Sequence, residues 1–157
     1  MKVLIMTDTK FGNGKILAKL LKEQFSIEAD TTIADVKEVT PESVANIVPD
    51  MIILGGAVRM FMGGTKSKKW LKELNSLLKK SNNKIKYGTG FLTHALPTSR
   101  VQGYAKKYLG KIESSSMIEK TYHELLTARV EGQEGPIIPE EMEKAKVYAN
   151  DIVNWIK

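Results

Sequence analysis

The sequence lacks cysteine, has only two histidines and contains no long apolar run. The absence of cysteine excludes disulfide bonds, thiolate metal sites and cysteine nucleophiles. The N-terminal apolar run, residues 3–6, is far too short for a signal peptide or a membrane span, and no other stretch approaches either length. We therefore expect a cytoplasmic protein with no membrane span.

The chain of 157 residues is long enough to form a single domain, residues 1–157, with a buried core. Hydrophobic residues make up 42% of the chain and alternate with charged segments, a pattern that argues against disorder. The net charge of +6 is uneven, since residues 66–86 hold eight lysines and residues 131–151 hold six acidic residues. We interpret the basic stretch as a solvated helix face, with a docking face for an acidic partner as the alternative. No nucleic-acid motif accompanies it, so we expect no nucleic-acid partner.

Apolar segments typical of buried strands alternate with segments of helical periodicity. Thr40 and Pro41 mark one helix start, as an N-cap and a first helical residue. The third and fourth predicted strands each end at a glycine-containing loop, residues 55–64 and residues 88–94. The predicted strands cover residues 3–6, 28–33, 51–54 and 84–89, with a fifth strand, bulged or interrupted, within 111–130. The first predicted helix ends near residue 25, and the second begins at residue 41. The third includes residues 70–78, and the last two cover residues 97–109 and 139–156.

This repeat of strand and helix predicts an α/β fold, a three-layer sandwich with a five-stranded parallel sheet and helices on both faces. In the strand order 2-1-3-4-5, the first, third and fourth strands are neighbours. Ligands of such sheets bind beyond the carboxyl ends of the strands, where the order reverses. The loops after these three strands are therefore expected to converge on one crevice.

The first of these loops has the composition of a phosphate site. Thr7 and Thr9 offer hydroxyl donors, and Asn13 offers an amide at the start of a helix. Gly12 and Gly14 allow tight curvature, so that the backbone N–H groups of residues 10–15 can surround an anion. A helix N-terminus adds a favourable dipole. The segment predicts a phosphate-binding loop, with an ordinary strand-to-helix turn capped by Asn13 as the alternative.

Two known nucleotide motifs do not match this segment. A Walker loop needs a hydroxyl residue after its lysine, and Lys15 is followed by Ile16. The dinucleotide fingerprint needs three glycines, of which residues 12–17 supply two, and Asp35 is a weak match for its ribose-binding acid.

Other functions that use this architecture also lack their key residues. A phospho-receiver domain needs an aspartate at the end of the third strand, where Gly55 and Gly56 stand. A class I amidotransferase needs a cysteine, and a cobalamin-binding domain needs an Asp-x-His-x-x-Gly pattern that surrounds neither His94 nor His123. We interpret His94 as a neutral surface residue, with a contact to a ligand edge as the alternative.

Three segments resemble loops of the flavodoxin family. Residues 7–14, Thr-Asp-Thr-Lys-Phe-Gly-Asn-Gly, resemble its phosphate loop. Residues 52–59, Ile-Ile-Leu-Gly-Gly-Ala-Val-Arg, resemble the loop that lies along one face of the flavin. Residues 87–91, Tyr-Gly-Thr-Gly-Phe, resemble the loop that covers the other face or edge. With Gly135-Pro136 before the last helix, the resemblance extends over essentially the whole chain.

The resemblance implies a flavodoxin-like fold, FMN as cofactor, and a function in electron transfer or flavin-mediated reduction, with a redox protein or a small-molecule electron acceptor as partner. The alternatives are a non-enzymatic module of this fold that works through protein contacts, and an NAD(P)H-dependent quinone reductase. No residue is assigned a catalytic or metal-binding role. The cofactor-binding residues implied by the resemblance are Thr7, Thr9, Lys10, Phe11, Gly12, Asn13, Gly14, Lys15, Gly56, Ala57, Val58, Arg59, Thr89, Gly90 and Phe91.

The sequence also departs from the family. Gly14 stands where the family usually has threonine or serine, which removes one hydroxyl from the phosphate site. The candidates for stacking on the flavin are Phe61, Phe91 and Met60. Arg59 is expected to place positive charge near the crevice and so to favour a reduced, anionic flavin.

Overall fold

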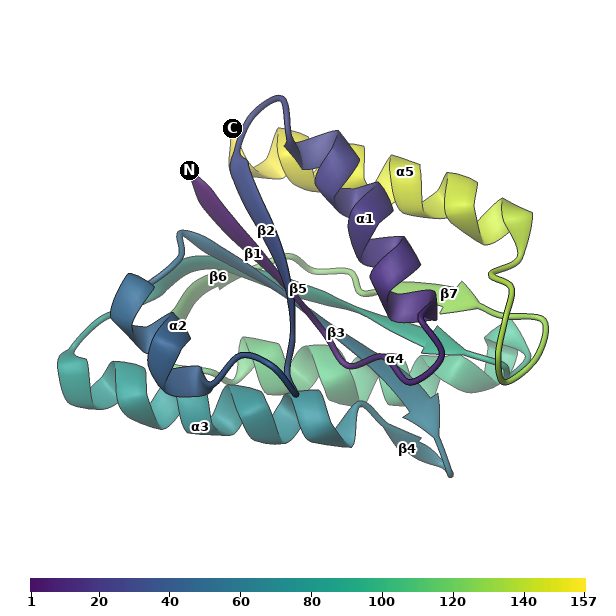
Figure 1. Cartoon of the computed structure of the whole chain (residues 1–157), viewed down its shortest axis with the longest axis horizontal. Helices are drawn as coiled ribbons and strands as arrows, with labels where there is room; N and C mark the ends of the chain where they lie inside the picture. Colours follow the sequence, from purple (N-terminus) through teal and green to yellow (C-terminus); the bar gives the residue numbers. More distant parts are fainter.

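Helices cover both faces of a central parallel sheet in the computed structural model, which describes residues 1–157 (Figure 1). The strands are β1 (Lys2–Thr7), β2 (Asp30–Asp35), β3 (Met51–Arg59), β4 (Met62–Gly63), β5 (Ile85–His94), β6 (Ile118–Thr121) and β7 (Leu126–Arg129). The helices are α1 (Asn13–Phe25), α2 (Pro41–Ile47), α3 (Thr65–Ser81), α4 (Thr98–Glu113) and α5 (Pro139–Ile156). No helix is both long enough and apolar enough to cross a membrane.

The order of the main strands is β2-β1-β3-β5-β6, and each neighbouring pair is parallel. Because β4 only forms a short antiparallel hairpin with β3, β5 and β6 are the fourth and fifth strands of the main sheet. The predicted order 2-1-3-4-5 is therefore confirmed. The fifth position is divided, since β6 pairs with the start of β5 and β7 with its end. This division is the interruption expected within residues 111–130.

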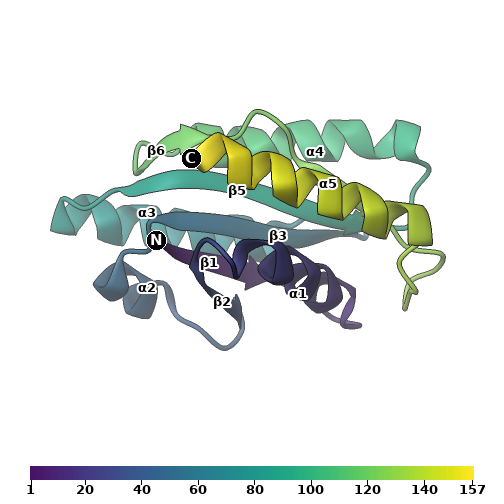
Figure 2. The ribbon, with the colours of Figure 1, turned by 90° about the horizontal axis from the view of Figure 1, so that it is seen from above.

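The sheet separates two apolar cores. Helices α1 and α5 lie on one face, and α2, α3 and α4 lie on the other, as Figures 1 and 2 both show. Side chains of β1 alternate between them, with Val3 and Ile5 in the first core and Leu4 and Met6 in the second. A strand that is apolar on both sides is typical of a parallel sheet covered by two helical layers.

Two strands are longer than predicted. β3 continues through Gly55-Gly56 to Arg59, and β5 continues through residues 88–94. The extra residues pair in register, with Gly55 beside Phe91 and Gly56 beside Leu92. A Cβ on Gly55 would lie 2.2 Å from Cζ of Phe91, so the glycine makes room for this ring. The prediction that residues 88–94 form a loop is wrong, because Gly55 lets the sheet close over Phe91.

The end of β3 turns back into β4 through a two-residue connection, Met60 and Phe61. Both residues have positive φ angles, 49° and 62°, which bulky side chains rarely adopt. Their side chains are also 88% and 86% exposed. The hairpin therefore projects an apolar tip from the sheet beside the carboxyl ends of its strands.

Candidate functional site

A pocket of about 330 Å³ opens at the carboxyl ends of β1, β3 and β5. Its volume lies within the range of roughly 300–1,000 Å³ that is common for small-molecule sites. The lining includes three basic or titratable side chains, from Lys10, Arg59 and His94, and no acidic side chain. The lining residues are Thr9, Lys10, Phe11, Asn13, Gly14, Ala57, Val58, Arg59, Met60, Thr93, His94, Ala95, Val130 and Gln133.

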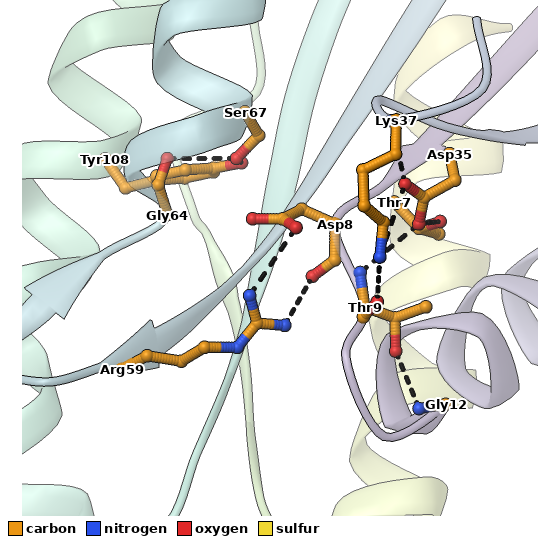
Figure 3. A network of polar contacts seen from close by, with 10 residues as sticks. All are labelled: Thr7, Asp8, Thr9, Gly12, Asp35, Lys37, Arg59, Gly64, Ser67 and Tyr108. Carbon is orange, nitrogen blue, oxygen red and sulfur yellow. Dashed lines mark hydrogen bonds and ion pairs between the residues drawn. The ribbon is translucent and has the colours of Figure 1, made fainter.

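The loop between β1 and α1 is held by the carboxylate of Asp35, which lies at the end of β2 (Figure 3). Asp35 Oδ2 accepts hydrogen bonds from the Thr7 hydroxyl at 3.0 Å and from the Thr9 amide at 3.3 Å. Its Oδ1 accepts from the Lys37 amide at 2.9 Å, and Lys37 Nζ donates to the Thr9 carbonyl. Asp35 is only 9% exposed, so these bonds are shielded from water. The carboxylate therefore fixes the shape of the loop from beneath.

Helix α1 begins with unbonded backbone amides that border the pocket. Gly12 precedes the helix in a left-handed conformation, with a φ of 90°, and its amide donates to Thr9 Oγ1 at 2.8 Å. The first amide to bond within the helix is that of Ile16, which donates to the Gly12 carbonyl at 3.0 Å. The amides of Asn13, Gly14 and residue 15 are left without a partner in the chain, as in any first helical turn. Donors of this kind, combined with the helix dipole, favour an anion.

Arg59 crosses from the end of β3 to the loop after β1 (Figure 3). Its guanidinium donates to the Asp8 carbonyl at 3.0 Å and lies 3.5 Å from the Asp8 carboxylate. Asp8 is 5% exposed, and its negative charge offsets that of Arg59. Arg59 lines the pocket as expected, but its charge is partly offset by Asp8. Arg59 also joins two walls of the pocket.

A second set of polar contacts lies behind β3, outside the pocket (Figure 3). The hydroxyl of Tyr108, on α4, donates to the Leu54 carbonyl at 3.2 Å and lies 2.8 Å from Ser67 Oγ. Ser67 Oγ in turn donates to the Gly64 carbonyl at 3.1 Å. Burial raises the pKa of Tyr108 far above its ordinary value, so this hydroxyl stays protonated. These bonds hold β3 and the hairpin in place on the side away from α1.

Eight of the predicted site residues line the pocket together: Thr9, Lys10, Phe11, Asn13, Gly14, Ala57, Val58 and Arg59. Four others lie next to it. The hydroxyl of Thr7 is bonded to Asp35 and to the Ala34 carbonyl, so its predicted role as a phosphate donor is wrong. The amide of Gly12 is bonded to Thr9, and the side chain of Lys15 faces a separate small hollow. Gly56 is buried inside β3 against Gly64.

The last three predicted site residues, Thr89, Gly90 and Phe91, lie in the sheet core and outside the pocket lining. The Thr89 hydroxyl lies 2.6 Å from the hydroxyl of Tyr148 on α5, and both side chains are buried. A Cβ on Gly90 would lie 2.5 Å from the Leu54 carbonyl oxygen. The Phe91 ring is 1% exposed and packs on Gly55, so its predicted role in stacking on a ligand is wrong.

Sequence reasoning missed part of one pocket wall, which comes from the end of β5 and from the segment after β7. Thr93 belongs to residues 88–94, which were expected at the crevice. Ala95, Val130 and Gln133 had no recognised pattern, because their approach depends on the extra length of β5 and on the return of the chain through β7. Met60, considered from its position after the third strand, does line the pocket. Phe61, the other candidate in this hairpin, lies outside the lining.

His94 also belongs to this wall, and the interpretation of it as a surface residue is wrong. It is 1% exposed and ends β5. Its Nδ1 lies 3.0 Å from the carbonyl oxygen of Leu96, two residues further along the chain. Burial lowers its pKa below the ordinary histidine value, an effect that exceeds the opposing one of this hydrogen bond. His94 is therefore a neutral imidazole in the pocket wall at pH 7.

Comparison with solved structures agrees with this architecture. Flavodoxin 2 from Bacillus cereus superposes with a TM-score of 0.72 at 16% identity, covering 98% of this chain and 99% of that protein. A flavodoxin, WrbA-like protein from Agrobacterium tumefaciens gives 0.72 at 15% identity, with coverages of 98% and 95%. A flavodoxin from the domain Archaea gives 0.65 at 14% identity and covers 99% of both chains. The fold is flavodoxin-like. No protein-family model matches the sequence, and no curated protein matches it as a sequence relative.

Proposed function

We propose that this flavodoxin-like chain binds FMN in the pocket and acts in electron transfer or flavin-mediated reduction. The observation that carries the proposal is the first turn of α1, whose free amides border a pocket without acidic side chains. A phosphate dianion is the ligand group that such a turn favours most. The similar solved structures are named as flavodoxins, which supports the choice of a flavin over other phosphorylated ligands.

The residues present fit the two ends of FMN. The amides of the first turn, the Thr9 hydroxyl and the ammonium group of Lys10 would hold the phosphate. Ala57, Val58 and Met60 offer apolar surface to a ring system on the opposite side. When bound, the flavin would supply the redox chemistry, and the chain would orient it and exclude water from one side. A redox protein or a small-molecule acceptor would then exchange electrons at the open mouth of the pocket.

The second candidate is a non-enzymatic module of the same fold that works through protein contacts. It is favoured by the fate of the two phenylalanines considered for stacking, since Phe91 is buried in the core and Phe61 lies on an exposed tip. Phe11, which is 39% exposed, is the one phenylalanine in the pocket lining. A flavin would therefore be held mainly at its phosphate end.

Parallel titrations with FMN and riboflavin, followed by flavin fluorescence, test the proposal. FMN binds more tightly because riboflavin has no phosphate for the α1 turn. Thr9→Ala removes one hydroxyl donor and weakens FMN about tenfold, since hydrogen bonds to charged groups contribute about 1.5–3 kcal/mol. The same variant changes riboflavin binding little. Equal affinities for FMN and riboflavin in the wild-type chain would overturn the proposal, and absence of binding would favour the non-enzymatic module.

A further inference from the structure

One buried side-chain polar atom in the structure has no hydrogen-bond partner: Nε2 of His94. Buried polar atoms in folded proteins are nearly always bonded, because an unpaired one has lost its hydrogen bonds to water without replacement. His94 is 1% exposed and lies in the wall of the pocket. The exception thus falls at the candidate site, although polar side chains such as Thr89 and Ser67 are buried elsewhere with their bonds made.

The other ring nitrogen determines what Nε2 can do. The Leu96 carbonyl can only accept a hydrogen bond, so Nδ1, at 3.0 Å, carries the proton of the neutral ring. Nε2 then holds a lone pair and acts as an acceptor. The hydrogen bond to Leu96, two residues after the end of β5, also fixes the orientation of the ring.

The charges around His94 do not change this assignment. From α5, Glu141 raises its pKa and Lys144 lowers it, and these two side chains are ion-paired with each other. Arg129 of β7 lowers the pKa further. Elsewhere in the pocket lining, Arg59 is paired with Asp8, and Lys10 is a further cation. Desolvation by burial remains the largest influence, and it favours the neutral ring.

We propose that His94 is a specificity-determining residue whose Nε2 accepts a hydrogen bond from an N–H or O–H group of the ligand in the pocket. This inference rests on the proposed function, in which the ligand is FMN. Oxidised FMN offers such donors at one ring N–H, N3–H, and at the hydroxyls of its ribityl chain. The wall of the pocket that contains His94 then selects for a donor, as the α1 turn selects for an anion.

A spectroscopic readout tests this contact directly. With ¹⁵N-labelled histidine the chain gives two imidazole spin systems, and His123→Gln removes one and so assigns the other. FMN is expected to shift the Nε2 resonance of His94 in the direction of a hydrogen-bonded acceptor, with Nδ1 nearly unchanged. If FMN binds but neither nitrogen of His94 moves, the inference is overturned and the proposed function stands. If FMN does not bind, both are overturned.

Variants of His94 give a second readout that does not depend on the spectrum. His94→Leu removes the acceptor and weakens FMN about tenfold, because the ligand's donor is left unpaired. His94→Gln keeps an acceptor at a similar distance from the backbone and stays within about threefold of wild type. His123→Gln, on the exposed histidine, leaves the affinity unchanged and serves as the matched control. Equal affinities in the wild-type, Leu and Gln proteins would overturn the inference.

Titration with 3-methyl-FMN, which lacks the ring N–H, shows which group of the ligand donates the hydrogen bond to His94. If the ring is the donor, the wild-type chain binds this analogue about tenfold more weakly than FMN, and the His94→Leu variant binds both equally. If the ribityl chain is the donor, the analogue shifts the His94 resonance as FMN does. Either result supports the proposed contact, whereas a loss of affinity for the analogue that is equal in the wild-type and Leu proteins contradicts it.

The proposal also predicts a pH dependence of binding. Protonation of Nε2 converts the acceptor into a donor, so the affinity falls as the pH drops below the pKa of His94 in the free protein, approaching about tenfold per unit. Riboflavin is the suitable probe, because it has no phosphate that titrates in the same range. In His94→Gln the fall should be absent. A fall of equal size in the variant would overturn the role assigned to His94.

Discussion

Two segments of similar composition, residues 7–14 and 88–94, use glycine and threonine for opposite purposes. In the first, Gly14 borders a pocket, and the amides that follow Gly12 make no bonds within the chain. In the second, a Cβ on Gly88 would lie 2.8 Å from Ile118 Cγ2, so core side chains of the protein itself occupy the space beside this glycine. Thr9 likewise caps an open turn, whereas Thr89 is fully buried against Tyr148.

The difference shows that glycine marks a close approach to the backbone without showing what approaches it. In the loop after β1, that surface is left to a ligand. In β5, side chains from α4 and β6 occupy the equivalent space. Only the neighbouring residues distinguish the two, since Phe91-Leu92 continues the apolar pattern of a strand and Lys10-Phe11 does not continue that of β1.

The largest expected effect is a loss of stability on truncating a core side chain in the buried segment, residues 88–94. Phe91→Ala removes a 1% exposed ring that fills the space over Gly55 and lies beneath the first turn of α1. We expect the free energy of unfolding to fall by about 3–5 kcal/mol, as for other large core truncations. Urea denaturation measures this change. Phe11→Ala, on the 39% exposed ring of the pocket, is the matched control and should cost under about 1 kcal/mol. A stable Phe91→Ala protein that had lost only flavin binding would restore the stacking role.

The second prediction tests whether ligand binding by residues 7–14 depends on their hydrogen bonds to Asp35 of β2. Asp35→Asn keeps the shape of the side chain but removes the charge that holds the amides of Thr9 and Lys37. We expect FMN affinity to fall about tenfold, because charge-assisted bonds contribute about 1.5–3 kcal/mol. Riboflavin affinity should change less. Asp30→Asn, at the exposed start of the same strand, is the control, and an equal effect of both variants on FMN would contradict the role of Asp35.

The layers, the strand order and the loop after β1 could be predicted because they rest on local patterns. Apolar runs of strand length, helical spacing and the Thr-x-Thr and Gly-Asn-Gly residues are all visible in one stretch of chain. The lengths of β3 and β5 could not, because they depend on the pairing of Gly55 with Phe91, 36 positions apart in the sequence. In the sequence, the apolar pattern of a strand ends at the glycine. In the structure, the strand continues, because an aromatic ring on the neighbouring strand packs into the space that the glycine leaves.

The site residues divide in the same way, into those that a local sequence pattern predicts and those that depend on contacts between strands. Residues 9–14 come soon after β1, and residues 57–59 are the last residues of β3, so most of them were found. His94 was assigned to the surface, since a lone histidine after glycines carries no periodic signal of burial. Asp35 was considered for a ribose, and its real contacts with Thr7 and Thr9 arise only because β2 lies beside β1 in register. Contacts between neighbouring strands are the part of the site that a single sequence does not specify.

The smallest expected effect is a gain, and it tests whether the open loop has room that the core segment lacks. A Cβ on Gly14 would lie 3.5 Å from Thr9 Cβ and 4.0 Å from Phe91 Cε2, which are ordinary contacts. Gly14→Ser therefore adds a hydroxyl at the pocket without displacing a neighbour, and FMN affinity should rise about three- to tenfold while riboflavin affinity stays constant.

Gly12→Ser is the matched control for Gly14→Ser, because it makes the same change two residues earlier. Its Cβ meets nothing within 4 Å, but the φ of 90° is one that serine rarely adopts, so this variant should lose stability and gain no affinity. Flavin titration and urea unfolding of the two proteins distinguish the effect of room for the new side chain from the effect of the backbone φ angle. If Gly14→Ser also gained no affinity for FMN, the backbone of the loop rather than its side-chain donors would determine phosphate binding.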